Sequence, residues 1–436
     1  MENKKLIKQR QESETFAFFA YGENYYRSRN TEIMNRVKKI YTETTGITTN
    51  PFGADHKVPG GHFKRIVMQK VGYLLGNGVI FGEKDQTDDL DQYFKTSMDE
   101  FIIDAGLMSS KKAEAWAYAY FKNGQLKFKL IPPEQITYEE DEDGEIIKIL
   151  RTYEKDGEQI ELEFTKEGMR RFKTKGKKTT VEELGHYSID TRFQGEIIEQ
   201  EQRTFKSIPF IPLFNNAERT SDLYDIKNLI DVHDIIVSDF ANNIDDMQEA
   251  FYTIKGYTGD AGKLSEFMRQ LKQIKVVPIG ADGDIKSHQG IIPTEARESL
   301  LRILKQEIYE TAMAIDLKSL TAGNITNVVI KAMFADLDLK TNQFENEIRK
   351  FIYGMIDFIN ENDAKQYTKE MNFERSLIIN RAEAIDSLIK LRTIYSDQTI
   401  REQLPFEIDL EEEEKRIAEQ QGQMRIQIPQ GNDDEE

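Results

Sequence analysis

The sequence contains no cysteine among its 436 residues, which excludes disulfide bonds, thiolate catalysis and cysteine-bound zinc. Histidine is scarce, and the five histidines form no His-Glu-x-x-His pattern, so a zinc site would have to use carboxylates. We see no signal peptide and no apolar run of the ~18 residues that a membrane span needs. We therefore expect a soluble protein that suits a reducing cytoplasm and does not contact a membrane.

Recognisable catalytic and cofactor motifs are also missing. The stretch Gly256–Leu264 looks like a phosphate-binding loop, but its spacing is too long and Leu264 stands where Ser or Thr must bind magnesium. The acidic run 139–144 resembles part of a calcium loop, but Leu150 stands where the last ligand, a glutamate, is needed. A solvated hairpin tip is the preferred interpretation of that run. We predict no catalytic residue, no metal and no cofactor.

Basic residues are in the minority, with 59 Lys and Arg against 77 Asp and Glu and a net charge of −18. Proteins that hold nucleic acid over a broad surface need Lys and Arg to displace counterions. DNA close to this protein is therefore expected to be repelled. The basic segment 166–178 has one aromatic residue, Phe172, and we interpret it as a charged turn or edge strand.

Residues 1–215 read as one α+β domain of a chain long enough for two or three domains. Residues 62–76 (HFKRIVMQKVGYLLG) have apolar positions at helical spacing, and Gly76-Asn77-Gly78 ends the helix. Asn123-Gly124 and Asp143-Gly144 each predict a β-hairpin turn. More short strands are expected up to about residue 206.

A long acidic helix is predicted over residues 222–249, with Ser221 or Thr220 as its N-cap. Its acidic side chains are opposed by Lys227 alone. His233 interrupts its apolar stripe, and a packed or interface histidine is the expected role. The stripe has the alternating spacing of a heptad repeat, and we predict that it packs the helix within and between subunits through Leu223, Ile226, Ile230, Val237, Phe240, Ile244 and Met247.

The second half of the chain reads as two helices around a small β-like insert, followed by a longer helix. The insert covers 250–292, the next helix 294–315, and the longer helix about 325–361, after a break at 317–327. Such a rod suits a ring, because rods from neighbouring subunits can pack on their apolar stripes. The acidic end of the chain, 421–436, is expected to be disordered.

Four stretches, in this order, resemble the portal proteins of tailed bacteriophages, in the siphophage branch related to the portal of a Bacillus phage. They are FKRIVMQKVGYLLGNGVIF (63–81), IPFIPLFNNAERTSDLYDIKNLIDVHD (208–234), AGNITNVVIKAMFADLDLK (322–340) and SDQTIREQLPFEIDLEEEEKRIA (396–418). The resemblance covers most of residues 20–420. Thr326-Asn327 departs from the Ser-Gly pair of many relatives.

The resemblance implies a portal-type α+β fold with a wing, a two-helix stem, a clip, a tunnel loop, a long helix and a helical crown. Carried onto this sequence, the wing is 1–215, the first stem helix 216–249, the clip 250–292, the second stem helix 293–316, the tunnel loop 317–327, the long helix returning to the wing 328–372, and the crown 373–420.

The function that the resemblance implies is a DNA conduit without catalysis. Portal subunits form a ring, usually of about twelve copies, at one vertex of the virion capsid. Double-stranded DNA passes through the ring without sequence preference during packaging and ejection. The expected partners are further copies of the chain, the terminase large subunit, the scaffold and major capsid proteins, and a head-completion or adaptor protein. Assembly is expected in the host cytoplasm.

Two groups of residues are candidate channel sites under this resemblance. Acids of the first stem helix could face the channel and keep DNA from binding to its wall, or they could merely solvate the outer face. They are Asp231, Asp234, Asp239, Asp245, Asp246 and Glu249. The tunnel loop has small and apolar residues that can touch a duplex without sequence preference. Its candidates are Lys318, Ser319, Leu320, Thr321, Ala322, Gly323, Asn324 and Ile325.

Two other interpretations stay open. The first is another phage capsid-associated adaptor, which would share the rod but have no DNA channel. The second is a hydrolase in which Asp282 and Asp284, or the run 139–143, hold a metal ion. Ring formation around a duplex-wide hole favours the portal, whereas an activity abolished by chelation favours the hydrolase.

Overall fold

The computed structural model describes residues 2–246 with short gaps, then 251–255, 284–288, 294–316 and 327–376, and isolated residues between 390 and 419. The short gaps fall at 38, 43–45, 50–53, 83–85, 123, 177 and 194–195. The described ranges mix helices with antiparallel sheets, which confirms the α+β class. Residues 317–326 of the predicted tunnel loop (317–327) and the predicted C-terminal tail lie outside them, whereas Asn327 begins the helix α10.

Three helices begin the chain, α1 (Glu2–Gln11), α2 (Glu14–Tyr26) and α3 (Thr31–Asn35). The Ser13 hydroxyl caps α2 by accepting the backbone N–H of Phe16 at 3.3 Å. Arg10 of α1 forms an ion pair with the buried Glu114 and lies over the ring of Phe19. These contacts fix the N-terminal helices on the sheet region.

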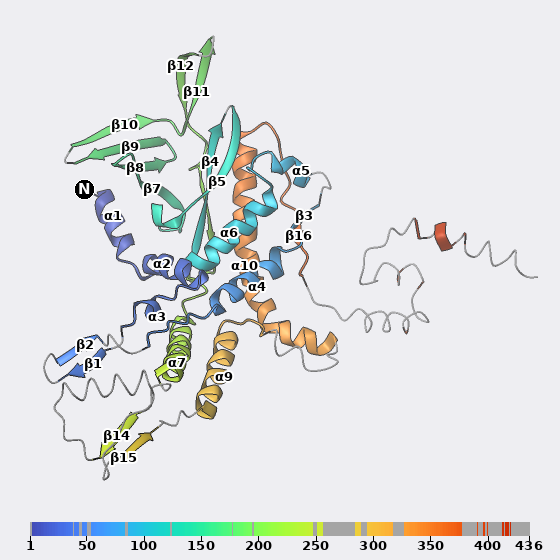
Figure 1. The fold of residues 1–436 in the computed structure, drawn as a ribbon. Coiled ribbons are helices and arrows are strands. Elements are labelled where there is room, and N and C mark those ends of the chain that lie inside the picture. The colour runs from blue at the N-terminus through green and yellow to red at the C-terminus, as the bar shows by residue number, and fades with distance from the viewer. Residues whose placement is uncertain are drawn as a thin grey trace, which may run out of the picture.

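The main core surrounds α10 (Asn327–Asn362), which stands beside a three-stranded sheet in Figure 1. The strand order is β13-β4-β5, from β13 (Phe210–Phe214), β4 (Glu114–Lys122) and β5 (Gln125–Ile131). Two further helices, α4 (His62–Leu75) and α6 (Met98–Lys112), share the core with α10. The predicted helix 62–76 is confirmed as α4.

Both predicted hairpin turns are confirmed. Gly124 joins β4 to β5 with a φ of 79°, and Gly144 joins β6 (Ile136–Glu140) to β7 (Ile146–Lys155) with a φ of 81°. Positive φ angles are open to glycine at no steric cost. The Asp141 carboxylate accepts the backbone N–H groups of Asp143 and Glu145 at 3.0 and 2.9 Å. The acidic run 139–144 is therefore a hairpin tip, as we interpreted it.

A five-stranded antiparallel sheet has the order β10-β9-β8-β7-β6 and includes β8 (Glu158–Thr165), β9 (Gly168–Lys175) and β10 (Lys178–Leu184). Most of the basic segment forms β9, which lies between β8 and β10, so the edge strand is β10. Arg170 pairs with Glu163 of β8, and Arg171 pairs with Glu182 of β10. Cross-strand carboxylates thus balance much of the charge of this segment.

The hairpin of β11 (Tyr187–Phe193) and β12 (Glu196–Arg203) projects beyond the five-stranded sheet in Figure 1. His186, at its base, lies 2.8 Å from the Thr165 carbonyl oxygen through Nε2 and accepts the Phe205 N–H at Nδ1. Burial lowers the pKa of His186. The neutral ring therefore joins the hairpin to the sheet.

The remaining short elements complete the described ranges. They are β1 (Lys39–Thr42) with β2 (Gly46–Thr49), β3 (Val79–Phe81) with β16 (Met371–Phe373), β14 (Phe251–Lys255) with β15 (Asp284–His288), the helix α5 (Gln86–Asp91) and the 3-10 turn η1 (Pro133–Gln135).

Two further helices, α7 (Lys227–Asp246) and α9 (Thr294–Thr311), lie side by side below the core in Figure 1. The first begins later than the predicted 222, because residues 222–226 form turns instead of a helix. Ser221 still acts near this start, since its hydroxyl accepts the Leu223 N–H at 3.2 Å. The division of the chain into wing, stem, clip and crown stays a prediction.

Candidate channel-forming helices

The first part of the predicted stem stripe is packed inside the subunit. Leu223, Ile226 and Ile230 are fully buried. They share the main core with Ile308 and Tyr309 of α9. These apolar contacts join the start of α7 to the end of α9 and to the rest of the core.

The later part of the stripe emerges from the core. Val237 and Phe240 are half-buried, and Ile244 is 48% exposed. Phe240 also contacts α9, because the Arg297 guanidinium lies 5.6 Å from its ring centre. Met247 lies outside the described residues. The heptad stripe therefore changes from a core position to a surface position along the length of α7.

Several acids of α7 bind the N-terminal part of the same subunit. Asp234, which is 0% exposed, accepts the Gly60 N–H at 2.8 Å and the Asn30 side-chain amide. Asp231, which is 7% exposed, accepts the Tyr25 hydroxyl. The carboxylates of these two residues are thus taken up by internal hydrogen bonds.

Farther along α7, polar side chains hold an extended segment, residues 54–61, which we call the strap. Ser238 accepts the Val58 N–H at 3.0 Å, and Asn242 accepts the His56 N–H at 2.6 Å. Asp245 contacts the His56 ring at 2.9 Å. A segment without sheet partners must find other acceptors for its backbone N–H groups, and α7 supplies them.

The predicted channel acids therefore differ in exposure. The side chain of Asp239 is 35% exposed and forms an ion pair with Arg36, and that of Asp245 is 52% exposed. Asp231 and Asp234 are enclosed within the subunit. The side chains of Asp246 and Glu249 lie outside the described residues. A channel-facing role stays a prediction, and exposure favours Asp239 and Asp245 for it.

Two histidines meet where α4 begins and α7 passes it. The rings of His62 and His233 are edge to face at 4.7 Å, and Tyr309 of α9 lies beside His62. Burial and the neighbouring His233 lower the pKa of His62 to about 4, although Asp234 opposes the shift. This fits the expected packed role of His233, and His62 is neutral at neutral pH.

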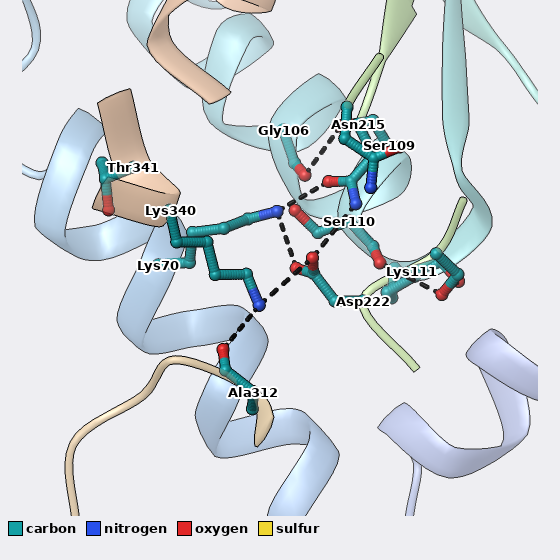
Figure 2. A network of polar contacts seen from close by, with 12 residues as sticks. Lys70, Gly106, Ser109, Ser110, Lys111, Asn215, Asp222, Ala312, Lys340 and Thr341 are labelled. Carbon is teal, nitrogen blue, oxygen red and sulfur yellow. Dashed lines mark hydrogen bonds and ion pairs between the residues drawn. The ribbon is translucent and has the colours of Figure 1, made fainter. Parts of the chain in front are cut away.

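A buried ionic network connects the helices at the root of α7 (Figure 2). Asp222, just before α7, lies 2.6 Å from the Lys70 ammonium of α4 and 3.4 Å from the Lys340 ammonium of α10. Asn215 accepts a hydrogen bond from Lys70 and donates one to Asp222. Lys70 also lies 4.1 Å from the ring centre of Phe344. We call Lys70, Asn215, Asp222 and Lys340 the ionic junction.

Charges in the ionic junction are strongly perturbed. Burial acts to raise the pKa of Asp222, but the ammonium groups of Lys340 and Lys70 outweigh it and lower that pKa to about 2. Burial lowers the pKa of Lys70 to about 8 against the opposing effect of Asp222. An open cavity of about 300 Å³ adjoins these residues.

Sequence reasoning missed this network, although one signal was present. Lys70 occupies the apolar stripe of its helix, between Ile66 and Leu74, and it is 1% exposed. A charged residue in an apolar stripe requires a buried partner. Asp222 and Lys340, however, lie far away in the sequence, and nothing local indicates the pairing.

Within the described ranges, no group of three His, Cys, Asp or Glu side chains could hold a metal ion. Among those same residues, no helix is long and apolar enough to cross a membrane. Asp284 begins β15, and Asp282 lies outside the described residues.

Comparison with known proteins identifies the family. The sequence profile of the phage portal protein family, SPP1 Gp6-like, matches residues 9–426. The chain belongs to this family. The portal protein of Clostridium phage phiCD119 is 26% identical over 419 residues, which cover 88% of this chain and 89% of that protein. The portal protein of Bacillus phage SPP1 is 28% identical over 428 residues, covering 92% of this chain and 83% of that protein.

Family membership makes the chain a structural portal protein of the phage virion, at the capsid vertex. A solved structure, the neck of an empty gene transfer agent particle computed with C6 symmetry, covers 80% of this chain and 90% of its own, with 10% identity and a TM-score of 0.47. That likeness is too weak to support conclusions about assembly.

Proposed function

We propose that the chain forms a closed ring that conducts double-stranded DNA into and out of the capsid. The ring has about twelve subunits and no catalytic activity of its own. Terminase docks on the clip during packaging, and head-completion proteins replace it afterwards. Scaffold and major capsid proteins surround the wing. Membership of the portal family is the observation that carries this proposal.

Exposed apolar side chains on the stem support ring formation. Ile244 on α7 is 48% exposed, and Leu300 and Ile303 on α9 are 44% and 47% exposed. The last two are three residues apart on a helix, so they share one face. A second copy of the chain would cover this face and remove its apolar area from water.

The channel wall is proposed to be acidic and weakly binding. Asp239 and Asp245 are the described acids of α7 that keep exposed side chains, and the net charge of the whole chain is −18. Like charge keeps a duplex from adhering to the wall. Residues 318–325, within the predicted tunnel loop, are proposed to touch the DNA.

Substitution of Ile303 tests the ring. Ile303→Asp places a charge on the exposed face of α9 and should leave the fold of one subunit intact, because the residue is 47% exposed in it. We expect the variant to stay monomeric in light scattering under conditions where the unaltered protein forms rings. Ile303→Leu keeps the face apolar and serves as the matched control. Rings of normal size from Ile303→Asp, with helical content unchanged, would contradict this interface.

The alternative of a capsid-associated adaptor without a channel is set aside, because the portal protein family matches residues 9–426 of the chain.

A further inference from the structure

The chain on the two sides of residues 317–326 converges on one helix, α4. On the entering side, the Gln69 side chain accepts the Ile315 N–H at 2.9 Å and donates to the Ile315 carbonyl at 3.3 Å. One amide side chain therefore satisfies both backbone groups of one residue, as a neighbouring strand would. On the leaving side, the Tyr73 hydroxyl donates to Asp338 of α10 at 2.7 Å.

A small apolar cluster joins these two sides. Tyr73 of α4 packs with Ile315 before the segment and with three residues of α10 after it, and the cluster is separate from the main core. The rings of Tyr73 and Phe334 are 5.4 Å apart. The members on α10 are Ile330, Phe334 and Leu337. Because Gln69 and Tyr73 are four residues apart, they stand on the same face of α4.

The chain that leaves α9 is also fixed before it reaches Ile315. Ala314 N–H bonds to the Tyr309 carbonyl at 2.9 Å, and Met313 has a φ of 52°. This is the left-handed end of a Schellman-type cap, with methionine where glycine is usual. Lys340 donates to the Ala312 carbonyl at 2.9 Å, so the ionic junction reaches the same short stretch.

We propose that Gln69 is the positioning residue for the DNA-facing segment of the channel. By holding Ile315 on the face of α4 that also holds α10, it sets where the segment 317–326 begins relative to where that segment ends. This inference rests on the proposed function, which assigns that segment to the channel.

The test measures separately the hydrogen bonds that hold Ile315 to Gln69 and the effect of Gln69 on DNA packaging. Gln69→Met keeps the side-chain length and removes both hydrogen bonds, and Gln69→Glu keeps an acceptor for the Ile315 N–H but loses the donor. Gln366→Met is the matched control, because Gln366 is exposed and donates to the Asn360 carbonyl away from α4. Amide hydrogen exchange at Ile315 and the rate of DNA packaging by assembled rings are measured for each variant.

In Gln69→Met, exchange at Ile315 should rise about fivefold or more, and packaging should slow while rings still form. Gln69→Glu should fall between this variant and the unaltered protein, and Gln366→Met should change neither measurement. Unchanged exchange at Ile315 would show that Gln69 does not hold this residue through the two hydrogen bonds. Faster exchange with an unchanged packaging rate would leave Gln69 structural and overturn its positioning role. If the unaltered rings do not package DNA, the proposed function fails instead.

Discussion

Removing the Asp222 carboxylate from the ionic junction should destabilise the fold more than removing Lys70, and removing both should cost less than the sum of the two single changes. Asp222→Asn removes the carboxylate that faces Lys70, whose side chain is 2% exposed. The Lys70 ammonium group then keeps Asn215 and the Phe344 ring, but no member of the ionic junction supplies a negative charge for it. Removing one partner of a buried ion pair costs about 3–5 kcal/mol, because the other charge is left uncompensated.

Lys70→Met should cost less, about 1–2 kcal/mol. The carboxylate of Asp222 would keep Lys340 at 3.4 Å and the Asn215 amide at 3.0 Å. The double variant, Lys70→Met with Asp222→Asn, leaves Lys340 as the one charge of the ionic junction, and its side chain is 17% exposed. Its cost should therefore be smaller than the sum of the single costs, with a coupling energy of about 2–3 kcal/mol.

Urea unfolding followed by tryptophan fluorescence measures these costs, because Trp116 is the single tryptophan and is 0% exposed. Ordinary lysine has a pKa of 10.5, and that of Lys70 is about 8. Loss of Asp222 should lower it further. The penalty of the charged lysine is full at low pH and is relieved as pH rises toward 10.5, so the deficit of Asp222→Asn should shrink from pH 7 to pH 9. Additive single costs, or a deficit under about 1 kcal/mol, would refute this reasoning.

Three further outcomes follow from the site. The pKa of His62 is about 4 in the folded protein and 6.5 ordinarily. The stability that depends on neutral His62 should therefore be fully present above pH 6.5, and the free energy of unfolding should fall by roughly 2–3 kcal/mol as the pH drops toward 4. His62→Phe should flatten that part of the profile, and an unchanged slope would exclude His62 as its source. Asp234→Ala should cost about 2–4 kcal/mol because two donors lose a buried acceptor, whereas Asp245→Ala, at an exposed site, should stay within about 0.5 kcal/mol; equal costs in urea unfolding would count against the strap contacts. The double variant Asp239→Asn with Asp245→Asn should slow DNA translocation through assembled rings. An unchanged packaging rate would contradict the hypothesis that acids of the channel wall repel DNA.

Much of the fold could be predicted because local signals were strong. Gly124 and Gly144 mark turns that require positive φ, and the structure has both turns there. The apolar stripe of α4 predicted the helix and most of its buried face, but not the burial of Lys70 and Tyr73. The predicted start of α7 was less accurate, because Asp222 pairs with Lys70 and Lys340 instead of beginning the helix. That choice depends on residues distant in sequence.

The candidate site was harder to predict, because acidic spacing does not reveal partners. The carboxylates of α7 suggested either a channel wall or a solvated face. The structure adds a third role, since Asp234 and Asp231 hold Gly60, Asn30 and Tyr25 of the same subunit. Only contacts between segments some two hundred residues apart decide this, as with Asn30 and Asp234, whose separation is 204. A single sequence carries no local trace of such pairs.

Electron microscopy of the purified protein, with light scattering on the same sample, tests the channel function most directly. We expect closed rings of about a dozen subunits around a central hole that admits a DNA duplex, formed either by the protein alone or after addition of scaffold and major capsid proteins. Failure to form rings under both conditions, or rings without such a hole, would contradict the proposed conduit.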